Sequence, residues 1–298
     1  MDNLTFDIIG VDGGTYNFKT SRKEFLCRGV YSTNTKFNIN NKGILELNGI
    51  RYQMGVGKFD AEIIKSKRDN LPLFLYSIAM STESENVKIV TGIPHYQLDK
   101  DEYVMEQKNK LIGDFKFKLN GEDRRLNILD VILLPEGVGA YYTVNENLSD
   151  KDVIFIDFGG STIHLIHFRN GELIKIKTIT KGSLNLLTDM LQYVNTEYGG
   201  RHDIDMVADY IRRGKIGKKE CNIVKDTVEL AQPYMDELLT LLDLEFPKDV
   251  AEYYITGGGV EVFSESVIQN LGDVGLIRDY MFANANGFEI AGGVIFGS

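Results

Sequence analysis

A short segment near the start of the sequence combines a carboxylate, two glycines and a lysine. In IIGVDGGTYNFKTS, Asp12 ends an apolar run, Gly13 and Gly14 follow it, and Lys19 comes seven residues after the aspartate. Glycine adopts backbone angles closed to other residues and lets a ligand approach the main chain. The residues after the glycines are typical of a returning strand, so the segment predicts a hairpin whose tip suits a phosphate. Ordinary β-turns have a similar composition, so this segment alone leaves both interpretations open.

The same pattern returns half a chain later. In DVIFIDFGGSTIHLIHF, which begins at residue 152, Asp157 corresponds to Asp12 and Gly159 to Gly14. Two such hairpins predict a duplicated domain whose equivalent turns face each other across a cleft.

A third glycine-rich turn lies in ITGGGVEVF, where 257–259 separate a predicted strand from a predicted helix. The N-terminus of a helix presents unpaired N–H groups and the positive end of the helix dipole, which favours an anion. Two common phosphate motifs are excluded. No segment has the GxxxxGK spacing of a P-loop, and Val262 and Phe263 stand near the place of the last glycine of a dinucleotide fingerprint.

The elements that must position these turns alternate between strand-like and helix-like runs, which predicts an α/β chain. Asn-Lys-Gly and Asn-Gly turns predict small hairpins within 37–55. Helices are predicted over 70–81, over 136–148 with Glu136 in the first turn, and over 221–244.

The composition limits the classes of function. A chain of 298 residues with 43% apolar residues favours two moderate domains. A formal net charge of −10 argues against direct binding to nucleic acid or to anionic membranes, so any link to DNA would need an adaptor. Cys27 and Cys221 are expected to be reduced thiols in a cytosolic protein. His164 and His167 lack zinc-site spacing and are expected in the core or on the surface.

Together these motifs resemble the superfamily of actins, sugar kinases and DnaK-type chaperones, and within it the bacterial ParM-like actins that segregate plasmids. The family's first phosphate motif, DxGxxxxK, is matched by Asp12, Gly14 and Lys19. The segment ITGGGVEVF is similar to the adenosine motif, and LLPEGVGAYY and FANANGFEIAGGVIF are similar to the two connecting segments. The second phosphate motif, DxGG with a following Ser or Thr, is matched by Asp157, Gly159, Gly160, Ser161 and Thr162.

The resemblance implies an α/β actin-like fold of two duplicated ribonuclease-H-like lobes around a nucleotide cleft. Lobe I is expected over 1–150, with a smaller subdomain inserted at about 22–90 and a C-terminal helix, 282–298, that completes it. Lobe II is expected over 151–281.

The resemblance also implies a site for ATP and Mg²⁺. Asp12 and Asp157 are expected to bind the metal, because Mg²⁺ prefers a few carboxylates together with water and phosphate oxygens. Glu136 is expected to orient or activate the attacking water. Adenine and ribose contacts are expected near DYIRRGKIG. The other expected nucleotide contacts are Gly13, Gly14, Thr15, Tyr16, Asn17, Lys19, Gly159, Gly160, Ser161, Thr162, Gly182, Gly257, Gly258, Gly259 and Glu261.

The function that the resemblance implies is a cytoplasmic, filament-forming ATPase. Its partners would be further copies of itself and an adaptor protein bound to a centromere-like site on plasmid DNA. Two alternatives remain open at this point. One is a small-molecule kinase or phosphatase with Asp130 or Asp189 near the acceptor, and the other is a protein that binds nucleotide as a structural ligand.

Overall fold

The structure is a computed structural model that describes residues 5–35, 42–60, 62, 64–217 and 219–297. The chain divides into two compact units. The first comprises Met1–Val144 and Phe282–Ser298, and the second comprises Asn145–Met281.

The first unit is built on one large sheet. Its described strands lie in the order β3-β2-β1-β7-β9-β8-β5-β6-β4. The strands are β1 (Asp7–Gly13), β2 (Asn17–Thr20), β3 (Leu26–Arg28), β4 (Tyr31–Ser32), β5 (Ile44–Leu47), β6 (Ile50–Met54), β7 (Asn86–Ile93), β8 (Gly113–Leu119) and β9 (Glu122–Pro135). The helices are η1 (Arg22–Glu24), η2 (Lys65–Lys67), α1 (Leu71–Ser81), α2 (His95–Leu98), α3 (Asp101–Leu111), α4 (Gly139–Tyr142) and α9 (Ala283–Phe296).

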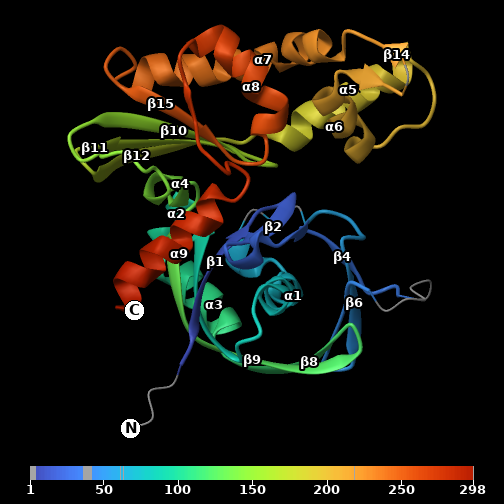
Figure 1. Cartoon of the computed structure of the whole chain (residues 1–298), viewed down its shortest axis with the longest axis vertical. Helices are drawn as coiled ribbons and strands as arrows, with labels where there is room; N and C mark the ends of the chain where they lie inside the picture. Colours follow the sequence, from blue (N-terminus) through green and yellow to red (C-terminus); the bar gives the residue numbers. More distant parts are fainter. Residues whose placement is uncertain (1–4, 36–41, 61, 63, 218, 298) are drawn as a thin grey trace. The chain divides into compact units, whose positions relative to one another are not determined.

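The sheet of the first unit curls around helix α1, which lies in its hollow (Figure 1). Almost every residue of α1 is buried, which agrees with the helix expected over 70–81. The aromatic ring of Phe74 meets that of Phe18 edge to face, with centroids 5.1 Å apart. Burial of apolar side chains from α1 and from both halves of the sheet therefore forms one core.

Helix α9 packs against the sheet and against α4 through glycine. A Cβ atom on Gly287 would lie 1.7 Å from the carbonyl oxygen of Gly139, and one on Gly10 would lie 1.8 Å from that of Ala285. The side chain of Asn284 also accepts a hydrogen bond of 3.2 Å from the N–H of Ala140. The C-terminal helix is thus held at backbone contact distance.

The second unit contains a smaller sheet in the order β12-β11-β10-β15-β16 and a two-stranded ribbon, β13 with β14, among its described residues. Its strands are β10 (Asp152–Phe158), β11 (Ile163–Arg169), β12 (Glu172–Ile179), β13 (Lys215–Ile216), β14 (Lys219–Glu220), β15 (Glu252–Thr256) and β16 (Gly275–Leu276). Its helices are α5 (Ser183–Glu197), α6 (Ile204–Arg213), α7 (Ile223–Glu245) and α8 (Val260–Leu271).

The two units share one strand order. In the first, β3, β2 and β1 are antiparallel neighbours, and β7 and β9 then continue in parallel with β1. In the second, β12, β11 and β10 are antiparallel, and β15 and β16 continue in parallel with β10. The predicted α/β fold of two duplicated ribonuclease-H-like lobes is therefore confirmed.

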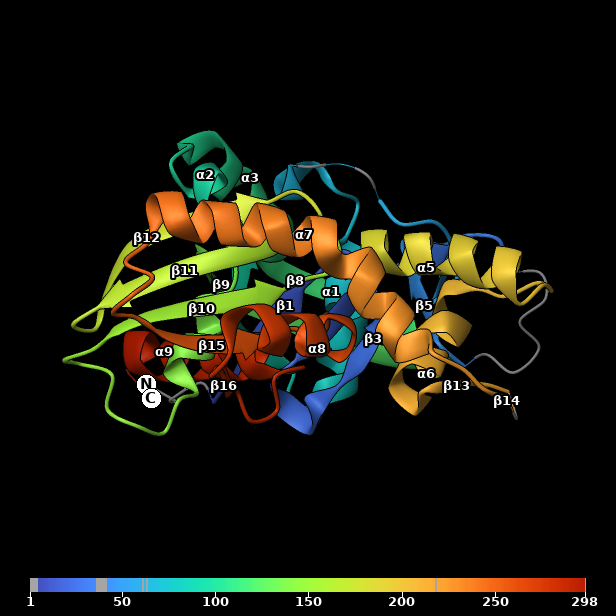
Figure 2. The same ribbon diagram turned by 90° about the horizontal axis from the view of Figure 1, so that it is seen from above.

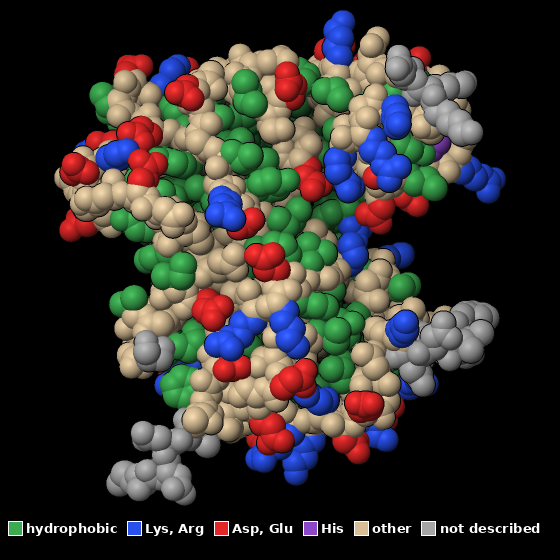
Figure 3. Space-filling model, viewed as in Figure 1, with side chains coloured by type: hydrophobic (Ala, Val, Ile, Leu, Met, Phe, Trp, Pro, Cys, Tyr) green, Lys and Arg blue, Asp and Glu red, His purple; other side chains and the backbone are tan. Residues whose placement is uncertain are grey.

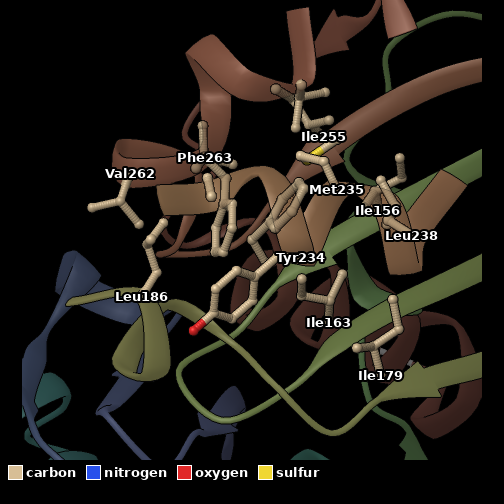
Figure 4. Packing of buried hydrophobic residues seen from close by; sticks show 14 of the residues in the cluster. Ile156, Ile163, Ile179, Leu186, Tyr234, Met235, Leu238, Ile255, Val262 and Phe263 are labelled. Carbon is tan, nitrogen blue, oxygen red and sulfur yellow. The ribbon is translucent and has the colours of Figure 1, made fainter. Parts of the chain in front are cut away.

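The core of the second unit lies between its sheet and its helices. Alternate residues of β10, namely Ile154, Ile156 and Phe158, face this core. Figure 4 shows Ile156 and Ile163 from the sheet close to Tyr234, Leu238 and Phe263 from helices α7 and α8. Figure 2 shows the long helix α7 running along β12 and β11, and Lys175 of β12 pairs with Glu245 at the end of α7.

Two predicted segments differ from the structure. The helix expected over 136–148 is limited to α4, because Gly137 has a φ of 82°, which breaks the helical path, and Glu136 lies in the turn before it. Hairpin β5–β6 turns at Asn48–Gly49 as expected, whereas the Asn-Lys-Gly turn expected at 41–43 begins at a residue outside the described part of the chain.

On the face shown in Figure 3, acidic and basic side chains are interspersed. No helix within the described residues is both long and apolar enough to cross a bilayer.

The close approach of α9 and α4 generates a first prediction. Gly287→Ala should destabilise the protein by about 2 kcal/mol, because the new methyl group would force two backbones apart. Gly293→Ala is the matched control on the same helix, since nothing lies within 4 Å of its added Cβ. The control should be neutral or more stable by up to about 1 kcal/mol, because alanine is the better helix former. Urea unfolding of both variants measures the difference, and equal stabilities would contradict the packing described here.

Candidate functional site

Three adjacent parallel strands of the first unit end at one edge of the sheet. Asp12 lies at the end of β1, Gly92 near the end of β7, and Glu136 directly after β9. The N–H of Glu136 donates a hydrogen bond of 3.0 Å to the carbonyl of Ile93. Because the carboxyl ends of parallel strands meet at the same edge, residues 12 and 136 lie at one edge of this sheet. We call the strand ends at this edge, together with the adjoining hairpin turn, the corner of the unit.

The first hairpin brings a cation to the aspartate. Asp12 and Lys19 are directly opposed across β1 and β2, and the ammonium nitrogen of Lys19 lies 3.1 Å from Oδ2 of Asp12. Lys19 is only 7% exposed. The hairpin therefore holds one negative and one positive group at the turn, where the predicted ligand would bind.

A second set of cations comes from a segment that the sequence did not single out. The ammonium group of Lys65 forms an ion pair with Glu136 and donates to the carbonyl of Gly13 at 2.8 Å. The guanidinium group of Arg68 donates to the hydroxyl of Thr15 at 3.2 Å. In the sequence these cations belong to a charged run, IIKSKRDN, that is typical of a solvated surface. No local signal distinguishes them.

Other predicted residues of the first hairpin have different surroundings. The ring of Tyr16 packs under the guanidinium group of Arg28, 3.7 Å from the ring centroid, so this ring is engaged within the protein. Oδ1 of Asn17 is buried with no hydrogen-bond partner among the described residues. A pocket of about 350 Å³ opens beside the turn and is lined in part by Gly13, Gly14 and Thr15. Its volume falls in the usual range for small-molecule sites.

The second unit repeats the corner. Asp157 ends β10 and is opposed across the hairpin by His164 on β11, as Asp12 is opposed by Lys19. The N–H of Gly159 closes the turn with a 2.9 Å hydrogen bond to the carbonyl of Thr162.

The start of helix α5 packs onto this second turn. The N–H of Ser183 donates to the carbonyl of Gly159 at 2.9 Å, and the N–H of Leu184 donates to that of Gly160 at 2.8 Å. A Cβ on Gly182 would lie 2.6 Å from both of these carbonyl oxygens. Glycine at 182 is therefore required for this approach, whichever ligand the turn binds.

The GGG turn between β15 and α8 joins the same site. The N–H of Gly259 donates to the carbonyl of Phe158 at 2.7 Å. A Cβ on Gly257 would lie 2.1 Å from Oδ1 of Asp157, and the φ of Gly257 is 89°. The structure thus brings together the second DxGG turn, Gly182 and the GGG turn. The sequence had predicted all three as parts of one nucleotide site.

His164 is a buried histidine, within the expectation of a core or surface position, and it also takes part in this corner. One ring nitrogen lies 2.9 Å from the hydroxyl oxygen of Thr162, and the other lies 3.0 Å from that of Thr178 on β12. Its position seven residues after Asp157, matching Lys19 after Asp12, is the signal that could have identified it.

A separate pocket of about 280 Å³ lies in the second unit between α6, α7 and α8. Ile211 and Arg212, from the DYIRRGKIG segment, line it together with Glu261 and Tyr280. Burial raises the pKa of the Tyr280 hydroxyl, so this group stays neutral and able to donate a hydrogen bond. Arg213 does not line this pocket. It forms an ion pair of 3.0 Å with Asp209 on the same helix.

Comparison with known proteins agrees with this architecture. Residues 10–139 match the family described as "Actin like proteins N terminal domain". The chain has an actin-like fold. No curated protein matches its sequence.

Among solved structures, the actin-like chain is similar to Ta0583, an archaeal actin homologue, with 18% identity, coverage of 97% of this chain and 100% of the other, and a TM-score of 0.79. Ta0583 has also been solved in complex with ADP. A 15-stranded ParM filament from Clostridium botulinum gives 17% identity, coverage of 98% and 100%, and a TM-score of 0.77. The apo psk41 ParM protein is 16% identical, the match covers 97% of this chain and 98% of the other, and the TM-score is 0.70. At these identities the likeness shows the fold.

The contact between Gly257 and Asp157 generates a second prediction. Gly257→Ala should destabilise the protein by about 2 kcal/mol or more, because the methyl group would meet a carboxylate oxygen and a positive φ strains alanine. Gly214→Ala is the control, since it has a φ of 66° but only ordinary contact, 3.9 Å from Val224. The control should lose about 1 kcal/mol from backbone strain alone. Thermal unfolding compares the two, and an equal loss would contradict the steric role of Asp157.

Proposed function

We propose that the chain is a cytoplasmic actin-like ATPase that binds ATP through the corners of both units and assembles into filaments. The observation that carries this proposal is the duplicated corner. In each unit an aspartate, Asp12 in β1 or Asp157 in β10, is the penultimate residue of its strand and lies beside a tight glycine turn with hydroxyl side chains. An ADP complex of the similar archaeal protein supports nucleotide as the ligand class.

The residues fit an ATP–Mg²⁺ ligand. The first corner supplies a buried ammonium group from Lys19 and the hydroxyl of Thr15, both suited to phosphate oxygens. The second corner supplies the Thr162 hydroxyl and glycines that allow close approach. No group of three or more metal-ligating side chains occurs in the described part of the chain. Mg²⁺ does not need one, because it keeps several waters and uses one or two carboxylates, here Asp12 and Asp157.

Within this site, we assign hydrolysis of the terminal phosphate to Glu136. A bound Mg²⁺ would neutralise charge on the phosphate oxygens. Glu136 orients a water molecule and accepts its proton as the water oxygen attacks the phosphorus atom, and the bond to the β-phosphate oxygen breaks to leave ADP and phosphate. Lys19 balances the negative charge of the terminal phosphates. The pocket lined by Arg212 and Glu261 is the proposed adenosine site.

The filament and its cargo are further parts of the proposal. ParM is named in three of the similar structures, and one of these is a filament. The partners are therefore other copies of this chain and an adaptor that binds a centromere-like DNA site. An adaptor is needed because a net charge of −10 opposes direct contact with DNA.

The kinase alternative lacks a comparable observation. Asp189 accepts a hydrogen bond of 2.6 Å from the hydroxyl of Tyr234, and Asp130 accepts one of 2.7 Å from the N–H of Val131. Both candidate acceptor-site carboxylates therefore have structural partners within the fold.

The role of Glu136 generates a third prediction. Glu136→Gln should lower ATP turnover by about 100-fold or more, because the amide cannot accept the proton of the water. Affinity for a fluorescent ATP analogue should stay within about threefold, since the residue acts on the water and not on the nucleotide. Glu122→Gln, at the exposed start of strand β9, is the control and should keep wild-type turnover. Unchanged turnover in E136Q would contradict the assignment of Glu136 as the group that accepts the proton of the water.

Assembly generates a fourth prediction. Light scattering of the purified protein should rise after addition of Mg-ATP at micromolar concentrations and fall as ATP is consumed. Electron microscopy at the plateau should show filaments, and EDTA should prevent the rise because it removes the divalent cation. A flat trace up to tens of micromolar protein, together with normal ATP turnover, would contradict the filament part of the proposal and leave an enzyme that does not polymerise.

A further inference from the structure

Lys65 is a buried cation in the corner of the first unit, and no sequence motif assigns it a role. It lies in the one-turn helix η2 and is 5% exposed. Its ammonium group contacts the carboxylate of Glu136, the carbonyl of Gly13 at 2.8 Å and the carbonyl of Gly92 at 3.2 Å. One side chain thus joins the ends of β1 and β7 to the glutamate that follows β9.

These contacts use the full donor capacity of the lysine. An ammonium group has three protons, and the three acceptors account for all of them. Lys19 differs, because its one ion pair among the described residues, with Asp12, leaves protons for a phosphate. The geometry therefore favours a role for Lys65 on Glu136 and on the backbone, and not on the nucleotide.

The segment that carries Lys65 is fixed by its own neighbours. The N–H of Lys65 donates to Oε1 of Gln97, which is fully buried, at 3.1 Å. The hydroxyl of Ser66 donates to Glu106 at 2.7 Å, and Lys110 donates to the carbonyl of Arg68 at 2.7 Å. Helices α2 and α3 therefore hold η2 in place. A cation anchored from both sides can define where its carboxylate partner lies.

We propose that Lys65 is the positioning residue of the site: it holds the Glu136 carboxylate in the orientation that receives the proton of the attacking water. The ammonium group also balances the charge of Glu136, whose side chain is only 18% exposed. Without this ion pair the Glu136 carboxylate would lose a contact that fixes its orientation. This inference rests on the proposed ATPase activity and adds a residue to it.

The test compares Lys65→Met with Lys67→Met in the full-length protein. Lys65→Met keeps the apolar stem and removes the charge, and we expect kcat for ATP to fall about tenfold or more while the Kd of ATP stays within about threefold. Lys67→Met removes a charge from the exposed side of the same segment and should leave both values unchanged. If Lys65→Met does not fold, Lys65→Gln, which keeps hydrogen-bond donors but no charge, replaces it with the same thresholds.

A double-mutant cycle separates positioning from a direct or a merely structural role. In the Glu136→Gln background, Lys65→Met should cause no further loss of kcat, because the residue acts through Glu136. Methylammonium should restore part of the turnover of Lys65→Ala by filling the vacated site, whereas tetramethylammonium, which cannot donate a hydrogen bond, should not.

Three results would overturn the inference: kcat of the Lys65 variant within twofold of wild type, losses that add in the double mutant, or a loss confined to nucleotide affinity. These results are distinct from failure of the proposed function, which would appear as absence of ATP turnover in the wild-type protein and would remove the basis for both.

Discussion

Parallel strands end at the same edge of a sheet, and the candidate corner of each unit depends on this constraint. In the first unit it brings Asp12, Gly92 and Glu136 together from strands that are far apart in the sequence. In the second unit the pairing of β10 with β15 places Asp157 beside the GGG turn. The helices and outer strands differ between the units, but the order and the directions of the central strands are the same. The chemistry of each unit can therefore be concentrated in the few residues that follow a strand.

The two corners have the same hairpin geometry but differ in the charge of the residue opposite the aspartate. An antiparallel hairpin fixes which residue stands opposite the aspartate, and seven residues of sequence lead to Lys19 in one unit and to His164 in the other. The first is an ammonium group paired with its aspartate. The second uses both ring nitrogens on threonine hydroxyls and so orients the Thr162 side chain. One unit thus presents cations to a ligand, while the other presents hydroxyl groups and a closely packed backbone.

These corners require close approach between backbone segments, and therefore glycine at particular positions. Gly182 and Gly257 stand where any side chain would meet the second turn or its aspartate, and Gly287 stands where α9 touches α4. Lys65 adds a different kind of constraint, since a buried cation is stable only with its full set of acceptors. Glycine and a saturated ammonium group therefore achieve the same end: they leave the groups at the strand ends little freedom to move.

The sequence by itself determined the α/β class, the repeated hairpins and the glycine turns, because each follows from the preferences of a few consecutive residues. It also predicted Glu136 as a site residue, but not its setting, since a positive φ at Gly137 replaced the expected helical turn. The tertiary structure alone decided the contacts of Lys65 and Arg68. Their contacts depend on how distant strands and helices pack around η2, and no local pattern of charge encodes that arrangement. The end of a strand is determined by neighbouring residues. The ion pair between Lys65 and Glu136, 71 positions apart, forms only once the intervening chain has folded.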